Sequence, residues 1–229
     1  DGGPWARICA LPAFWVGLLY DEDALTAAWD LAKGWSREMR EALREDILLV
    51  LDAAYAEYME EADYNAGEKL VDDYENVVMT RTFSKIYGLA ALRLGWGYCP
   101  PAIADVLNRV RGPFNVTMAA QYAGAAALDD QDFIRRNREY NRAERDYMQQ
   151  QLGGMGLDFV PSHGNFVLVK FPSEPGRNAD DIQAYLKKNG VIVREMGSYG
   201  LGDYLRVTVG PKAANRKFIE LLEKKFSRD

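Results

Sequence analysis

Five side chains that can do chemistry follow one another between residues 52 and 93. Asp52 and Tyr55 lie in "LDAAYAEY", and Ser84, Lys85 and Arg93 lie in "TFSKIYGLAALRLGWG". A lysine amine condenses with an aldehyde to form an imine. A carboxylate can keep a pyridine nitrogen protonated, a phenol can donate to a ring oxygen, and a serine hydroxyl beside an arginine suits a phosphate dianion. Together the five residues predict a site for an aldehyde cofactor that carries a pyridine ring and a phosphate.

Each of these residues also has an ordinary structural explanation. An aspartate at the end of a strand is more often a cap or loop residue. A single arginine is more often solvated or salt-bridged than bound to a ligand. The set becomes a site only if the fold brings its members together.

The polar residues come directly after apolar runs that have the pattern of strands. "ILLVLD" (47–52) is a continuous apolar run, typical of a strand buried on both faces of a parallel sheet, and it ends at Asp52. "NVVMTRTF" (76–83) is a second such run, and Ser84 and Lys85 follow it. In open α/β sheets, ligands bind beyond the carboxyl ends of the strands, so these residues are expected to share one crevice.

Helices and strands alternate along the rest of the chain. Apolar residues at helical spacing predict a helix over residues 21–44. Further strands are expected over 92–99, 165–171, 191–196 and 204–210, and further helices over 101–112, 116–130, 131–156, 178–190 and 211–226. This order predicts an α/β fold, with a parallel-sheet portion up to about residue 130 and a smaller α+β lobe after it.

Composition argues against several other classes of protein. The net charge of −6 disfavours nucleic acid or an anionic membrane as the main partner. Cys9 and Cys99 lack metal-ligand spacing, and His163 is the single histidine, so no metal site is expected. The sequence contains no convincing signal peptide or membrane span and suits a reducing cytoplasm.

Five quoted segments resemble histidinol-phosphate aminotransferases, a family of fold type I pyridoxal-phosphate enzymes. They are "VLDAAYAEY", "TRTFSKIYGLAALRLGWGYCP", "RGPFNV", "SHGNFVLVKF" and "DYLRVTVG". The resemblance extends from about Leu43 to the C-terminus, so it covers the C-terminal two-thirds of such an enzyme. It implies pyridoxal 5′-phosphate as the cofactor.

The resemblance implies a role for each residue of the first set. Lys85 is similar to the lysine that binds the cofactor as an imine and moves a proton during catalysis. Asp52 resembles the partner of the pyridinium nitrogen, and Tyr55 the donor to the ring oxygen. Ser84 and Arg93 resemble the ligands of the cofactor phosphate.

Two further residues are similar to substrate-binding positions of the family. Arg206, in "LRVTVG", resembles the arginine that binds the carboxylate of the amino-acid co-substrate, and Asn165, in "GNFVLV", lies near the substrate side. Two other residues invite a functional interpretation but favour a structural one. His163 is interpreted as a loop residue and Arg194, in "VIVREM", as a salt-bridged strand residue.

Residues 1–42 do not fit the family. They are expected to be an atypical helical segment, where the family's N-terminal part is missing or replaced. Residues 43–130 then form a partial large cofactor-binding domain and residues 131–229 a small C-terminal domain. The expected fold is a truncated fold type I PLP-transferase, with a partial parallel-type sheet and a small α+β domain. Apolar surface that such a partial domain leaves uncovered predicts a homodimer.

Three functions remain open at this point. The first is transamination between histidinol phosphate and 2-oxoglutarate in histidine biosynthesis, with an amino-acid or amino-alcohol phosphate as the substrate. The second is a weakly active or inactive scaffold derived from such an enzyme. The third is a related PLP-dependent decarboxylase.

Overall fold

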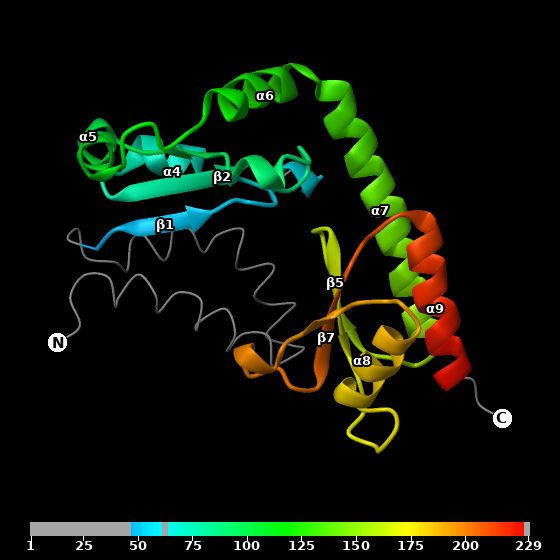
Figure 1. Cartoon of the computed structure of the whole chain (residues 1–229). Coiled ribbons are helices and arrows are strands. Elements are labelled where there is room, and N and C mark those ends of the chain that lie inside the picture. The colour runs from blue at the N-terminus through cyan, green and yellow to red at the C-terminus, as the bar shows by residue number, and fades with distance from the viewer. Residues whose placement is uncertain (1–46, 61–63, 227–229) are drawn as a thin grey trace. The chain divides into compact units, whose positions relative to one another are not determined.

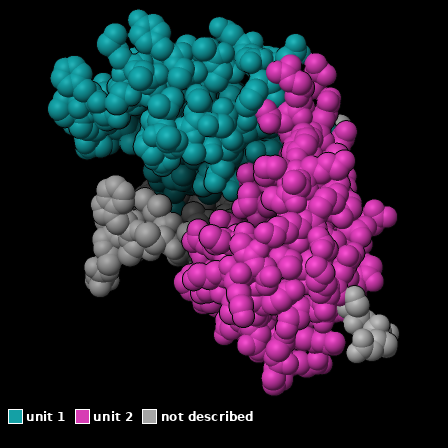
Figure 2. Space-filling view, turned by 45° about the vertical axis from the view of Figure 1, so that its right-hand side comes forward, with its two compact units in different colours: residues 1–134 teal, residues 135–229 magenta. Residues whose placement is uncertain are grey.

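The computed structural model describes residues 47–60 and 64–226, which divide into two compact units (Figures 1 and 2). The division falls between Ile134 and Arg135. The predicted helix over 21–44 and the N-terminal segment 1–42 lie outside the described residues. No helix within the described ranges is long and apolar enough to cross a membrane.

The first unit combines a small sheet with short helices. Its strands are β1 (Leu49–Asp52), β2 (Val77–Thr82) and β3 (Gly95–Tyr98). Its helices are α4 (Glu68–Asp73), α5 (Pro101–Val110) and α6 (Met118–Asp129), with the 3₁₀ turns η1 (Ala56–Tyr58) and η2 (Ala90–Leu92). Helix α7 (Gln131–Gly154) begins in this unit and continues into the second.

The sheet of the first unit has the order β1-β2-β3. Strands β1 and β2 are parallel, with Asp52 opposite Thr80, as the two apolar runs predict. Strand β3 joins β2 in the antiparallel direction, so only one pair of the described sheet is parallel. The carboxyl ends of β1 and β2 therefore lie at the same edge of the sheet.

Helix α4 covers the apolar residues of β1 and β2. Its Leu70 and Val71 pack with Leu49, Val77 and Met79, which are all buried. The sequence pattern predicted a first strand buried on both faces, but Val50 and Leu51 are only half-buried and Asp52 is exposed. Within the described part of the chain β1 is an edge strand, which explains the difference.

The residue that precedes α4 is a glycine, and it lies against β1. Gly67 precedes α4 with φ of 110°, a conformation that side chains rarely adopt. A Cβ atom at Gly67 would come within 2.4 Å of the Leu51 Cδ1 atom. Its amide donates to the Asn65 side chain at 2.7 Å, which closes the turn.

The second unit is an antiparallel sheet covered by helices on one face. Its strands are β4 (Phe159–Val160), β5 (Phe166–Lys170), β6 (Arg194–Glu195) and β7 (Tyr204–Thr208), in the order β4-β5-β7-β6. Its helices are the main part of α7, α8 (Ala179–Lys188) and α9 (Lys212–Phe226), with the 3₁₀ turn η3 (Gly197–Tyr199). In Figure 1 these helices lie to the right of the green-yellow β5 and the orange β7.

The register of β5 and β7 assigns their side chains to two faces. Val167 lies opposite Val207, and these side chains belong to the core that includes Met148, Leu152 and Ile182 of the helices. Leu168 lies opposite Arg206, one residue further along each strand, and therefore on the other face. The helices consequently cover one face, and Arg206 belongs to the face they do not cover.

Three elements differ from the sequence pattern. The strand expected over 191–196 is reduced to Arg194–Glu195, because the preceding Val191–Val193 segment turns Val193 into the helical core. The patterns gave no sign of α4 or β4, which have six and two residues, because so few residues show no reliable periodicity.

Candidate active site

Asp52 and Tyr55 lie where β1 ends. The Asp52 Oδ1 atom accepts a hydrogen bond from the Ala54 amide at 3.2 Å, which turns the chain out of the strand. The chain then forms η1, and Tyr55 is the residue that precedes this turn. The Asp52 side chain is exposed at the edge of the sheet, and its Oδ2 atom has no hydrogen bond within the described residues.

Lys85 lies in a compact turn that follows β2. The Ser84 amide donates to the Thr82 hydroxyl at 3.1 Å, and the Gly88 amide donates to the Lys85 carbonyl at 2.9 Å. Ile86, the next residue, is buried and anchors the turn against Tyr58. The turn therefore holds the lysine backbone at the carboxyl edge of β2 and leaves the side chain partly exposed.

The Lys85 ammonium lies over the ring of Tyr55, with 5.1 Å between Nζ and the ring centroid. This contact connects the two strand ends, because Tyr55 follows β1 and Lys85 follows β2. The predicted imine lysine and the predicted donor to the ring oxygen are thus adjacent in the fold. A cation above the face of a phenol ring is itself weakly attractive.

Ser84 and Arg93, the predicted ligands of the cofactor phosphate, are hydrogen-bonded to each other. The Arg93 Nη1 atom donates to the Ser84 hydroxyl at 3.4 Å and to the Ala90 carbonyl at 2.9 Å. Arg93 has φ of 53°, an uncommon conformation for a residue with a side chain, and it ends η2. Its Nε and Nη2 atoms have no partner within the described ranges, so the guanidinium can still bind an anion.

Arg81, on β2 itself, has a different environment from Arg93. It donates to Glu57 at 2.9 Å and to Glu68 at 3.3 Å, and it lies over the ring of Trp96 at 5.6 Å. Its charge is therefore neutralised by two carboxylates. Arg93, by contrast, has no carboxylate partner within the described residues, so it can accept a phosphate at the sheet edge.

Tyr58 is buried in an apolar cluster beside Tyr55 and Ile86. Burial, together with the smaller effects of the neighbouring Tyr55 and Glu57, raises the pKa of its phenol from 10.0 to about 12. The phenol is consequently neutral at any physiological pH. It serves the site as a buried wall behind Tyr55 and Ile86, with 6.1 Å between the centroids of the two tyrosine rings.

Arg206 belongs to the second unit, on β7. Its guanidinium carbon lies 5.3 Å from the centroid of the Phe166 ring. Its Nε atom is buried and has no hydrogen-bond partner within the described residues. A buried donor without a partner is costly, and a bound carboxylate or phosphate would satisfy it.

Asn165 stands immediately before β5. Its carbonyl accepts from the Val209 amide at 2.8 Å, which fixes its backbone to the end of β7. Within the described ranges its side-chain amide makes no hydrogen bond. Arg206 and Asn165 thus lie in the second unit, whereas Lys85 and Arg93 lie in the first.

Arg194 is a candidate that the sequence pattern led us to regard as structural. The register places it directly opposite Arg206, so the two guanidinium groups start from neighbouring positions on one sheet face. Its partner within the described residues is the Tyr199 hydroxyl at 3.2 Å, and no carboxylate pairs with it there. Only the strand register, which the sequence does not reveal, identifies this pair of cations.

His163 contributes its backbone to the structure. Its carbonyl accepts from Arg145 at 2.7 Å, in the segment that leads into β5.

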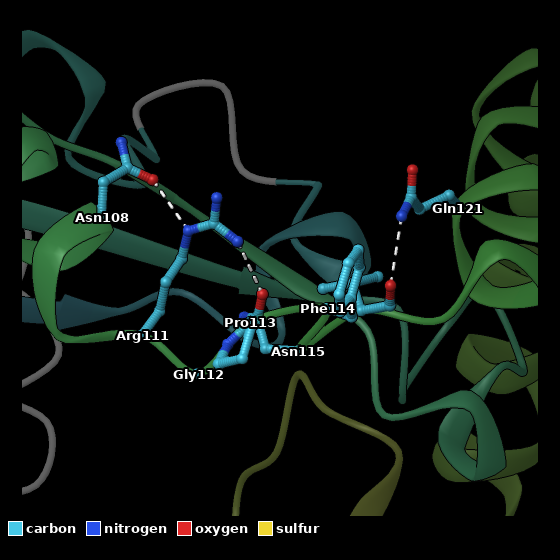
Figure 3. Close-up of a pocket in the computed structure, with 8 residues that line it drawn as sticks. Asn108, Arg111, Gly112, Pro113, Phe114, Asn115 and Gln121 are labelled. Carbon is cyan, nitrogen blue, oxygen red and sulfur yellow. Dashed lines mark hydrogen bonds between the residues drawn. The ribbon is translucent and has the colours of Figure 1, made fainter.

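A separate hollow lies in the first unit, around the loop between α5 and α6 (Figure 3). Arg111 points toward Asn108 and Asn115 there and donates to both side chains at 2.9 Å. Gln121 donates to the Val116 carbonyl at 3.1 Å. None of the predicted site residues lines this hollow, so it is not the predicted cofactor site.

Fold and sequence together define the class of protein. The chain belongs to the aminotransferase class I and II family, whose model matches residues 33–222. The histidinol-phosphate aminotransferase of Maricaulis maris is 52% identical over 186 residues, which cover 81% of this chain and 51% of that enzyme. The histidinol-phosphate aminotransferase of Rhodospirillum centenum is 51% identical over 176 residues, or 77% of this chain and 48% of that enzyme.

A solved structure extends the similarity to three dimensions. The histidinol-phosphate aminotransferase of Sinorhizobium meliloti, determined in complex with pyridoxal-5′-phosphate, matches with a TM-score of 0.74 and 31% identity. The match covers 82% of this chain and 51% of that one. The expected fold type I architecture is thereby confirmed. The chain spans about half the length of the relatives that it matches.

Proposed function

We propose that this chain carries the cofactor lysine and the substrate arginine of a PLP-dependent histidinol-phosphate aminotransferase. The reaction would transfer the amino group of histidinol phosphate to 2-oxoglutarate, which gives imidazole-acetol phosphate and glutamate in histidine biosynthesis. The observation that supports it most is the contact of Lys85 with Tyr55 at the shared carboxyl edge of β1 and β2. This geometry occurs in a chain with 52% identity to an enzyme of that name.

The residues at the sheet edge fit pyridoxal phosphate by their chemistry. Lys85 offers the amine, Asp52 an exposed carboxylate, and Tyr55 a phenol beside the amine. Ser84 and Arg93 offer a hydroxyl and an arginine fork for the phosphate. When bound, the group supplies a carbonyl that condenses with amines and a ring that withdraws electrons.

The chain's own residues then have separate tasks. Lys85 would hold the group through its amine, and the same amine could move a proton at the reacting carbon. The Asp52 carboxylate would keep a proton on the ring nitrogen. Tyr55 would donate a hydrogen bond to the ring oxygen, with the neutral Tyr58 behind it.

The arginines on the sheet face opposite the helices of the second unit would hold the anionic ends of the substrates. Arg206 would bind the carboxylate of glutamate, with Asn165 close to the substrate. The opposed Arg194 adds a second positive charge. Two adjacent guanidinium groups suit a dianion, such as the phosphate of histidinol phosphate, better than a single carboxylate.

We also propose that the protein is a cytoplasmic homodimer. Exposed apolar side chains on α5 and α6, among them Val110 and Tyr122, support self-association. Cys99 is a free thiol, which suits a reducing compartment.

Formation of the imine tests the proposal directly. The purified chain, mixed with pyridoxal phosphate, should develop a visible absorption band that borohydride removes. Mass spectrometry should then find the reduced cofactor on the peptide that contains Lys85. Lys85→Ala should lack both signals, whereas Lys69→Ala, which changes an exposed lysine of the same unit, should retain them.

Turnover separates the three functions that the sequence leaves open. Production of glutamate from histidinol phosphate and 2-oxoglutarate supports the aminotransferase, and release of carbon dioxide from an amino-acid phosphate supports a decarboxylase. A chain that binds the cofactor but does neither is a scaffold. A visible band that persists in Lys85→Ala would refute the role given to that lysine.

A further inference from the structure

One face of α7 binds a short backbone segment through three polar side chains. Asn141, Arg145 and Gln149 are four residues apart, so they form a single row along the helix. The segment they bind, residues 162–164, leads directly into Asn165 and β5. Helix face and segment both belong to the second unit.

The hydrogen bonds run in parallel along the row. The Asn141 Nδ2 atom donates to the Gly164 carbonyl at 3.0 Å, and the Arg145 Nη1 atom donates to the His163 carbonyl at 2.7 Å. The Ser162 amide donates to the Gln149 Oε1 atom at 3.2 Å. Three consecutive residues of the segment are thus each held by a different turn of α7.

Burial makes this arrangement more than a surface contact. Asn141 is 7% exposed and Arg145 is 8% exposed. The charge of Arg145 is balanced only weakly, by Asp146 at 3.4 Å, whose side chain is 58% exposed. The Arg145 Nε atom is buried without a partner within the described residues. A polar row of this kind is unfavourable as packing, so its effect is to specify the backbone of the segment.

Asn165 is fixed from both directions as a result. The clamped segment holds it from the N-terminal side, and the hydrogen bond from Val209 to its carbonyl holds it on the β7 side. Its side-chain amide is left without a protein partner within the described ranges. A fixed backbone with an uncommitted carboxamide is suited to a polar group of a ligand.

We infer that Asn141, Arg145 and Gln149 are positioning residues, which hold the Asn165 carboxamide in place to bind the amino donor. The part of this inference that concerns ligand binding rests on the proposed aminotransferase function, because that function gives Asn165 its ligand. The three residues act through Asn165 and do not themselves contact the substrate.

The first arm of the test needs no ligand. NMR of the full chain should show one sharp pair of side-chain amide signals for Asn165, assigned by their absence in Asn165→Ala. Arg145→Gln should broaden or shift that pair, and Arg145→Lys, which keeps a donor for the His163 carbonyl, should largely restore it. Arg136→Gln, an exposed arginine of the same helix, should change nothing. An unchanged Asn165 signal in a folded Arg145→Gln protein would overturn the inference.

The second arm is a double-mutant cycle on histidinol phosphate binding to the cofactor-loaded chain, measured by calorimetry. Arg145→Gln and Asn165→Ala should each weaken binding about tenfold. In the Asn165→Ala background, Arg145→Gln should cause no further loss, because its effect passes through Asn165. If Arg145→Gln lowered the affinity for histidinol phosphate equally in the wild type and in Asn165→Ala, its role would be merely structural and the inference would be refuted.

The two arms separate the two proposals. If the wild-type chain binds no histidinol phosphate, the proposed function fails, and the NMR arm still decides whether α7 positions Asn165. Asn141→Ala serves as the second variant if Arg145→Gln does not fold, since it removes the donor to Gly164 without leaving a charge.

Discussion

Arg81, on β2, and Arg93, at the end of η2, have different environments. We therefore expect Arg93 to contribute to cofactor binding and Arg81 to contribute to the stability of the fold. Arg81 is neutralised by the buried Glu57 and by Glu68, whereas Arg93 keeps two nitrogen atoms free of described partners. Arg93→Gln should therefore weaken pyridoxal phosphate binding about tenfold or more and leave the free energy of unfolding nearly unchanged. Arg81→Met should lower the free energy of unfolding by about 3 kcal/mol, because the buried Glu57 would lose the ion pair with Arg81.

Absorbance titration with the cofactor and urea denaturation measure the two quantities. The assignment of the phosphate site to Arg93 would be wrong if Arg93→Gln bound the cofactor as tightly as the wild type. Loss of binding in a well-folded Arg81→Met protein would instead assign the anion to Arg81.

The raised pKa of Tyr58 predicts how the protein responds to alkali. The phenol has a pKa of 10.0 when exposed and about 12 when folded. Below pH 10 the phenol keeps its proton in both the folded and the unfolded state, so this group does not reduce the free energy of unfolding. Above pH 10 the unfolded state loses the proton first, so stability falls until the folded pKa is passed. In Tyr58→Phe the midpoint of alkaline unfolding, followed by circular dichroism, should move to higher pH; an unmoved midpoint would contradict a buried phenol.

At the scale of elements, the contact of β3 with β2 depends on one glycine. A Cβ atom at Gly95 would approach the Arg81 carbonyl oxygen to 2.8 Å, and backbone cannot move aside as easily as a side chain. Gly95→Ala should therefore destabilise the chain by about 1–3 kcal/mol. The next glycine of the strand, Gly97, would place its Cβ atom an ordinary 3.7 Å from the Met79 carbonyl oxygen.

Urea denaturation of the two alanine variants checks this prediction under matched conditions. Gly97→Ala should be nearly neutral. If both variants lost similar free energy of unfolding, β3 would tolerate no added side chain at either position, and the close approach at Gly95 would not be the cause.

The elements also show how far sequence patterns reach. Helices α7 and α9 and strands β2, β5 and β7 were predicted because long periodic or apolar runs identify such elements. The grouping of Asp52, Tyr55 and Lys85 followed from the rule that strand ends meet at one edge. The opposition of Arg194 and Arg206 could not be predicted, because β6 contributes two residues and its register depends on tertiary packing.

The polar row on α7 was hidden for a similar reason. Asn141, Arg145 and Gln149 have the spacing of any solvated helix face, and nothing in their types distinguishes them from the exposed arginines nearby. Only the structure shows that two of them are buried and that they bind the backbone before β5.

At the scale of the whole molecule, the apolar surface of α5 and α6 predicts self-association. Val110 is 73% exposed, Phe114 95% and Tyr122 71%, and α5 has no buried residue. We expect sedimentation velocity at micromolar concentration to show the mass of two chains. Val110→Glu should shift the protein toward one chain, whereas Ile192→Glu, an equally exposed site in the second unit, should not. A wild-type protein that sediments as a single chain would exclude the proposed homodimer.

The opposition of Arg194 and Arg206 has a consequence for the folding energetics of the free protein. Like charges directly across two strands are locally frustrated, so the unliganded sheet is less stable than its backbone pairing allows. A phosphate or sulfate ion should relieve this frustration and raise the melting temperature of the wild type. Arg194→Glu should turn the repulsion into attraction, stabilise the unliganded protein by about 1 kcal/mol, and abolish the response to the anion. Calorimetry with and without phosphate would measure both effects, and an Arg194→Glu protein that melts at a lower temperature would contradict them. The register that opposes these two arginines would thus make the stability of the protein depend on the anion.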